Sequence, residues 1–103
     1  MYILLTEMET TGFTSCKIQG LHPTDLLALE TKLSSSSITS IRQDDFFEVD
    51  TNGVRLLNIL AGNDYGYRIC NQSMAIEKSN IGGRTTQVQK IVWTLYREKE
   101  TIV

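Results

Sequence analysis

The last quarter of the chain repeats apolar residues with the period of an amphipathic helix. A glycine pair, Gly82-Gly83, precedes this stretch, and Thr85 or Thr86 can cap the helix that follows. Its apolar positions stand three or four residues apart: Val88, Ile91, Val92 and Leu95. The pattern therefore predicts a helix over residues 84–99, followed by an apolar terminal strand at residues 101–103.

Strand-forming residues dominate the beginning of the chain. Residues 2–8 and 13–18 are rich in aliphatic, aromatic and β-branched side chains, and Thr10-Thr11-Gly12 between them is typical of a turn. These segments predict a hairpin. Residues 38–50 fit one or two further strands, with three core candidates: Phe46, Phe47 and Val49.

A helix is predicted between these strands, over about residues 23–33. Pro23 is well placed at the first helical position, and Asp25 lies in the first turn, where it faces the positive end of the helix dipole. His22 then serves as the cap. The helix has one apolar stripe, made of Leu26, Leu29 and Leu33.

The middle of the chain is ambiguous. Asn52-Gly53 is a hairpin signal, but the residues after it also have helical spacing, and Asp50 or Thr51 can cap a helix over residues 54–61. We favour this helix, with an apolar face at Val54, Leu57 and Leu60. A further helix is predicted over residues 70–79.

An alternative makes residues 66–97 one long hairpin that turns at Asn80–Gly83. Four residues of the last segment have high strand propensity: Val92, Trp93, Thr94 and Tyr96. The helical period opposes this propensity, and we favour the period. The predicted fold class is α+β, with short N-terminal strands, one helix and then a three-helix C-terminal half.

Composition indicates one globular domain over residues 1–103, with 41% hydrophobic and 21% charged residues. Residues 1–53 hold eight acidic and three basic side chains, whereas residues 54–103 hold four acidic and seven basic ones. The start lacks the features of a signal peptide, and no apolar run approaches the length needed to cross a bilayer. We therefore expect a cytoplasmic protein with reduced thiols at Cys16 and Cys70.

The sequence offers little catalytic chemistry. It has one histidine, no phosphate-binding glycine loop and no cluster of metal ligands, and the Asp44-Asp45 pair is typical of a solvated turn. We therefore expect neither an enzyme nor a protein with a cofactor or metal.

The predicted order of helices 54–61, 70–79 and 84–99 before an apolar strand resembles the winged-helix form of helix-turn-helix domains. Three local features carry the resemblance: Ala75 in the positioning helix, Ile81 in the turn, and Thr85-Thr86-Gln87-Val88 at the start of the recognition helix. The resemblance implies a transcriptional regulator that forms a homodimer and reads double-stranded DNA with helix 84–97. Its implied DNA-binding residues are Arg84, Thr85, Thr86, Gln87, Gln89, Lys90, Arg97 and Lys99.

A second hypothesis assigns the chain to a different class, that of small protein-binding modules or inhibitors. The β-rich first part, residues 1–50, is acidic and would dock on a basic protein partner. The docking residues would be Asp44, Asp45, Glu48 and Asp50.

Overall fold

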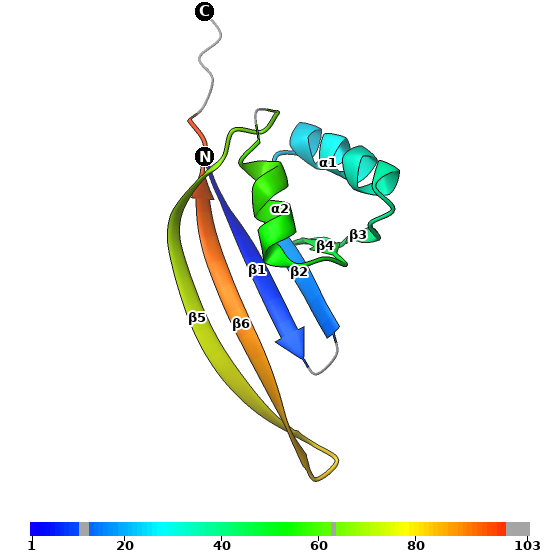
Figure 1. Ribbon diagram of the computed structural model, residues 1–103, viewed down its shortest axis with the longest axis vertical. Helices are drawn as coiled ribbons and strands as arrows, with labels where there is room; N and C mark the ends of the chain where they lie inside the picture. Colours follow the sequence, from blue (N-terminus) through cyan, green and yellow to red (C-terminus); the bar gives the residue numbers. More distant parts are fainter. Residues whose placement is uncertain (11–12, 63, 99–103) are drawn as a thin grey trace, which may run out of the picture.

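The computed structural model describes residues 1–10, 13–62 and 64–98, and in these ranges the chain forms six strands and two helices (Figure 1). All paired strands are antiparallel, in the spatial order β3-β4-β2-β1-β6-β5. The elements in chain order are β1 (Tyr2–Thr10), β2 (Phe13–Gln19), α1 (Pro23–Ser35), β3 (Ser40–Arg42), β4 (Phe47–Val49), α2 (Gly53–Leu60), β5 (Arg68–Ile81) and β6 (Arg84–Tyr96).

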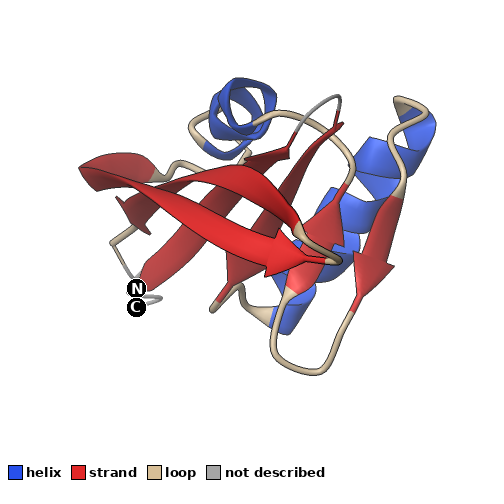
Figure 2. Ribbon diagram, turned by 90° about the horizontal axis from the view of Figure 1, so that it is seen from below, coloured by secondary structure: helices blue, strands red, loops and turns tan. Residues whose placement is uncertain are grey.

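One face of the sheet, which we call the core face, carries the buried strand residues. In β1 and β6, Ile3 lies opposite Leu95 and Leu5 lies opposite Trp93, and all four are buried. The helices pack on this face through Leu29 and Leu33 of α1 and Leu56 and Leu60 of α2. In Figure 2 the two helices flank the twisted strands.

The predictions for the first half are largely confirmed. β1 pairs with β2 as a hairpin, although Thr11 and Gly12 of the predicted turn lie outside the described residues. α1 begins at Pro23, and its cap is His22, whose Nδ1 accepts a hydrogen bond from Thr24 N–H at 3.2 Å. Phe47 and Val49 are buried, while Phe46 is half-buried beneath the Lys17 ammonium group.

The short helix α2 is confirmed, but its cap and its buried face differ from the prediction. The cap is Asn52, whose Oδ1 accepts a hydrogen bond from Arg55 N–H at 2.9 Å. Val54 is exposed, and Leu56 takes its place in the core. Glu7 Oε2 accepts a hydrogen bond at 2.5 Å from the N–H of Gly53, the first helical residue.

The predicted three-helix C-terminal half is wrong, and with it the resemblance to winged-helix domains. Residues 70–79 lie in β5 and residues 84–96 form β6, so the chain has no recognition helix in its described part. β5 and β6 form one long hairpin that turns at Gly82 and Gly83, both with positive φ (60° and 79°). Two consecutive positive φ values are what a two-residue hairpin turn of type I′ requires. The predicted strand at residues 101–103 lies outside the described residues.

A helical period appeared in β6 because this strand has apolar residues on both faces at its centre. Trp93 and Leu95 point to the core face, whereas the intervening Val92 and Thr94 belong to the opposite face. An inner strand half-covered on its second face loses the strict alternation that identifies strands from sequence.

Candidate interaction surface on the β5–β6 arm

The hairpin of β5 and β6, which we call the arm, projects beyond the helices (Figure 1). β1 pairs with β6 only as far as Glu9 opposite Gln89. The residues beyond this point, 77–88, therefore form a two-stranded tip. β5 is the last strand of the sheet, so its outer edge has no strand partner among the described residues.

An apolar stripe runs along β5 on the core-face side. Ile69, Met74 and Ile76 are 53%, 61% and 55% exposed. An irregularity in the pairing at Cys70 shifts the alternation by one residue, so that Ile69 shares a face with Met74 and Ile76. The stripe therefore extends the core face past the cover of the helices. Exposed apolar residues gathered on one surface are typical of a binding site.

The backbone of β5 is open at the same place. The N–H of Gln72 donates to the side chain of the preceding residue, Asn71 Oδ1, at 2.8 Å, which indicates that it points to the outer edge. Because N–H groups alternate in direction along a strand, those of Met74 and Ile76 also point to the outer edge. This edge is therefore a row of donors and acceptors beside the apolar stripe.

The central part of this edge has few of the devices that usually protect edge strands. Natural proteins place charges, prolines or bulges on such edges to prevent unwanted pairing. β5 has its bulge at Cys70 and charged residues at Glu77 and Lys78, but residues 71–76 contain neither charge nor proline. This six-residue segment is therefore suited to strand addition.

The structure brings most of the predicted DNA-binding residues to the distal half of β6, but on a strand. Thr85, Gln87 and Gln89 alternate on the core-face side, opposite Asn80, Lys78 and Ile76 of β5. Arg84 and Lys90 belong to the opposite side of the ribbon. Thr86 lies in the same strand, opposite Ser79, and Lys99 lies outside the described residues.

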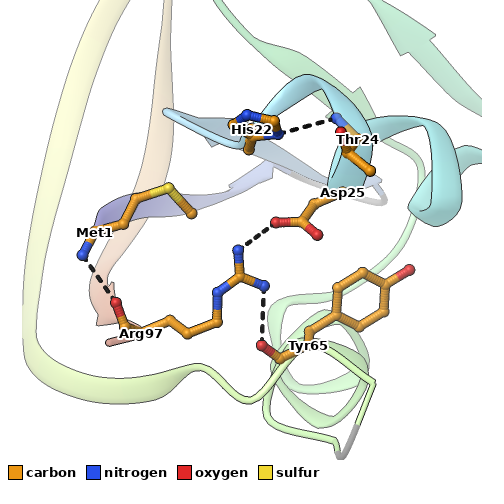
Figure 3. Close-up of polar contacts among 6 residues, drawn as sticks. All are labelled: Met1, His22, Thr24, Asp25, Tyr65 and Arg97. Atoms are coloured by element: carbon orange, nitrogen blue, oxygen red, sulfur yellow. Dashed lines mark hydrogen bonds and ion pairs between the residues drawn. The ribbon is translucent and has the colours of Figure 1, made fainter. Parts of the chain in front are cut away.

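Arg97 has a different environment from that predicted, as Figure 3 shows. Its guanidinium group donates to Asp25 Oδ2 at 2.5 Å and to the carbonyl oxygen of Tyr65 at 3.1 Å, and lies 4.6 Å from the centre of the Tyr67 ring. Its backbone also pairs with that of Met1. Arg97 thus ties β6 to α1 and to the segment before β5, and is engaged within the fold.

The acidic residues of the second hypothesis lie along the β3–β4 hairpin. Asp44 and Asp45 are exposed in its turn, and Asp50 is exposed after β4. Glu48 is half-buried and lies opposite Lys17 of β2. All four residues therefore lie in this hairpin or directly after it, in the part of the sheet formed by β3 and β4. Within the described ranges, no group of three or more His, Cys, Asp or Glu gathers as metal ligands.

The two cysteines differ in their surroundings. Burial, and then the nearby Glu7 carboxylate, raises the pKa of the Cys16 thiol to about 12, and its sulfur donates to the carbonyl oxygen of Thr51 at 3.2 Å. Such a thiol is a poor nucleophile. Cys70 is exposed on the arm.

The helix predicted over residues 70–79 hides the apolar stripe. The alternative prediction, one long hairpin over residues 66–97, is the one from which the stripe can be recognised. In a strand, Met74 and Ile76 share a face, and on a terminal strand that face stays open. The position of β5 at the edge of the sheet cannot be predicted from its own residues, because it follows from the pairing of β1 with β6.

Comparison with known proteins identifies a similar fold but no family. No protein-family model matches the chain, and no curated protein matches it. A conserved kinetoplastid-specific protein from Trypanosoma cruzi, known from a crystal structure, superposes with a TM-score of 0.59. The match covers 94% of this chain and 95% of that one at 9% sequence identity, so the likeness concerns the fold alone. Neither α1 nor α2, the helices of the described ranges, is long and apolar enough to cross a bilayer.

Proposed function

We propose that the protein is a protein-binding module that adds an extended segment of a partner to the outer edge of β5. The open backbone edge beside the exposed stripe of Ile69, Met74 and Ile76 is the observation that carries this proposal. In strand addition, main-chain hydrogen bonds supply affinity, and alternate side chains supply specificity. A suitable partner segment has apolar residues at every second position, to lie beside Met74 and Ile76.

The proposal moves the protein-binding hypothesis from the acidic hairpin to the arm. Apolar area removed from water stabilises a complex more dependably than exposed charges, which salt screens. Docking of a basic partner on Asp44 and Asp45 stays a prediction. We place the activity in the cytoplasm, which the free thiols of Cys16 and Cys70 support.

A displayed library of random decapeptides, selected on the immobilised protein, tests this function. We expect selected peptides to alternate apolar residues, to lack proline, and to slow amide exchange at Met74 and Ile76. Met74→Lys should abolish binding. Val54→Lys is the matched control. Val54 on α2 is 63% exposed, a fraction similar to the 61% of Met74, but it does not belong to the arm. Peptides that bind without protecting these amides, or no enrichment at all, would refute strand addition.

Contact with double-stranded DNA is a second candidate function, favoured by the polar side chains of the tip. Lys78, Thr85 and Gln87 share one face of a two-stranded ribbon, and a major groove admits such a ribbon. Arg84 and Lys90 would meet phosphates. This candidate ranks second because so few cations give weak binding.

Fluorescence anisotropy with random duplex DNA across a salt series tests the second candidate. Binding should weaken as salt rises, and replacing Arg84 and Lys90 by alanine should reduce the slope of log K against log salt by about one for each phosphate contact. No binding at low salt would exclude it.

A further inference from the structure

We infer that the strand accepted by β5 is the β5 strand of a second copy of this chain, so that two subunits form one continuous sheet around a two-fold axis at Ser73. The inference rests on the proposed function and names its partner. A two-fold axis perpendicular to the sheet runs the two β5 strands antiparallel and keeps the core faces on the same side.

The register follows from which side chains share a face. Because of the irregularity at Cys70, the core-face side of β5 carries Ile69, Gln72, Met74 and Ile76, and the opposite side carries Arg68, Asn71, Ser73, Ala75 and Glu77. Counting outward from Ser73 in both directions, and passing over Cys70 as the extra residue of the irregularity, gives pairs that lie on the same face at every step. Met74 lies opposite Gln72 of the partner subunit, and Ala75 lies opposite Asn71 of the partner subunit.

The outer pairs of this register are complementary in chemistry. Ile76 lies opposite Ile69 of the partner subunit, so the two exposed isoleucines cover each other. Glu77 lies opposite Arg68 of the partner subunit and forms an ion pair. The two-fold axis repeats each contact, which gives two apolar pairs and two ion pairs. Opposite charges and apolar pairs directly across two strands stabilise sheets.

Neighbouring registers lose this complementarity. With the axis at Met74, Ile69 lies opposite Lys78 of the partner subunit, and Glu77 lies opposite Asn71 of the partner subunit. With the axis at Gln72, Met74 lies opposite Ile69 of the partner subunit, but Arg68 lies opposite Ala75 of the partner subunit and both ion pairs are lost. The ion pairs therefore select the axis at Ser73.

The backbone directions agree with the same register. The N–H groups of Gln72, Met74 and Ile76 point outward, which places Gln72 and Met74 of the partner subunit at a hydrogen-bonded pair of the new ladder. Asn71 Oδ1, which accepts from Gln72 N–H in the single chain, holds the place of the carbonyl oxygen that the second copy supplies. Ser73 at the axis is then a pair without hydrogen bonds, with a Cα separation of about 4.5 Å.

A disulfide tests the axis directly. In a Cys70→Ser background, Ser73→Cys should give a covalent dimer under mild oxidation, because its Cα separation lies in the disulfide range of about 4.4–6.8 Å. Ala75→Cys is the matched control, since two copies of that residue would lie roughly 13 Å apart. Failure of Ser73→Cys to cross-link, or equal cross-linking of Ala75→Cys, overturns the register.

Sedimentation across a concentration series tests the dimer and its ion pairs. Glu77→Arg and Arg68→Glu should each weaken dimerisation roughly tenfold or more, and the double variant should restore it. Val54→Lys should leave it unchanged. A chain that stays monomeric throughout, or single variants that dimerise like the parent, overturns the inference. The peptide selection described above then still decides the proposed function, since it does not require a second copy.

Discussion

Gly53 lies where the first turn of α2 meets the Trp93 ring, and adding one methyl group there should destabilise the fold. A Cβ at this position would lie 2.5 Å from both Cη2 and Cζ3 of Trp93 and 3.1 Å from Glu7 Oε2. Its φ is not positive, so space alone requires glycine here. Overpacking of this kind costs about 1–3 kcal/mol, and the better helix propensity of alanine returns at most about 1 kcal/mol.

We therefore expect Gly53→Ala to lower the free energy of unfolding by about 1–2 kcal/mol. In a domain of this size, the melting temperature falls by about 4–8 °C for each kcal/mol. Urea titration followed by circular dichroism measures the loss. Asn58→Ala, at an exposed position of the same helix, is the control and should change stability little.

A double-mutant cycle identifies the contact responsible. Trp93→Phe removes the ring atoms that the new methyl group would touch, so Gly53→Ala should cost much less in that background. The expected coupling energy is about 1 kcal/mol or more. Equal costs of Gly53→Ala in both backgrounds, or a single variant as stable as the parent, would refute the packing argument.

Three further predictions concern the two cysteines and the cap of α2. Cys70 should react with a thiol reagent in the native protein, whereas Cys16 should react only after unfolding. Folding raises the pKa of the Cys16 thiol from 9.0 to about 12, so its contribution to stability is complete below pH 9.0 and is lost as the pH rises toward 12. Between about pH 8 and about pH 10, the urea midpoint of unfolding should therefore decrease more in the parent than in Cys16→Ala. Asn52→Ala removes the cap of α2 and should cost about 0.5–2 kcal/mol by urea titration; a loss no larger than that of Asn58→Ala would contradict the capping role.

Local signals predicted the first half of the fold well. Proline at the first position of α1, the histidine cap and the two strand segments of the first hairpin each act within a few residues. Such signals are readable because their energies depend on neighbours in sequence. The N-cap of α2 was harder to predict, because Asp50, Thr51 and Asn52 all have side chains that can cap a helix. Only the path of the backbone selects Asn52.

The second half depended on contacts between distant residues. Whether Val92 and Trp93 belong to a helix or a strand is decided by β1, which supplies Thr6 and Leu5 as their cross-strand partners. Packing of this kind outweighs a chance helical period. The interaction surface was hidden for the same reason, because the exposure of Met74 follows from the position of β5 at the end of the sheet.

The central position of β1 also has a consequence for how the protein is made. β1 is synthesised before β2 and can pair with it early, but its other edge is completed only by β6 (residues 84–96), which is synthesised after the other five strands of the sheet. Throughout that interval the apolar segment Ile3–Leu5 lacks half of its neighbours. Late pairing between distant segments slows folding and prolongs exposure of an aggregation-prone strand. Nascent chains that stop before Arg84 should therefore depend on chaperones more than the released protein does.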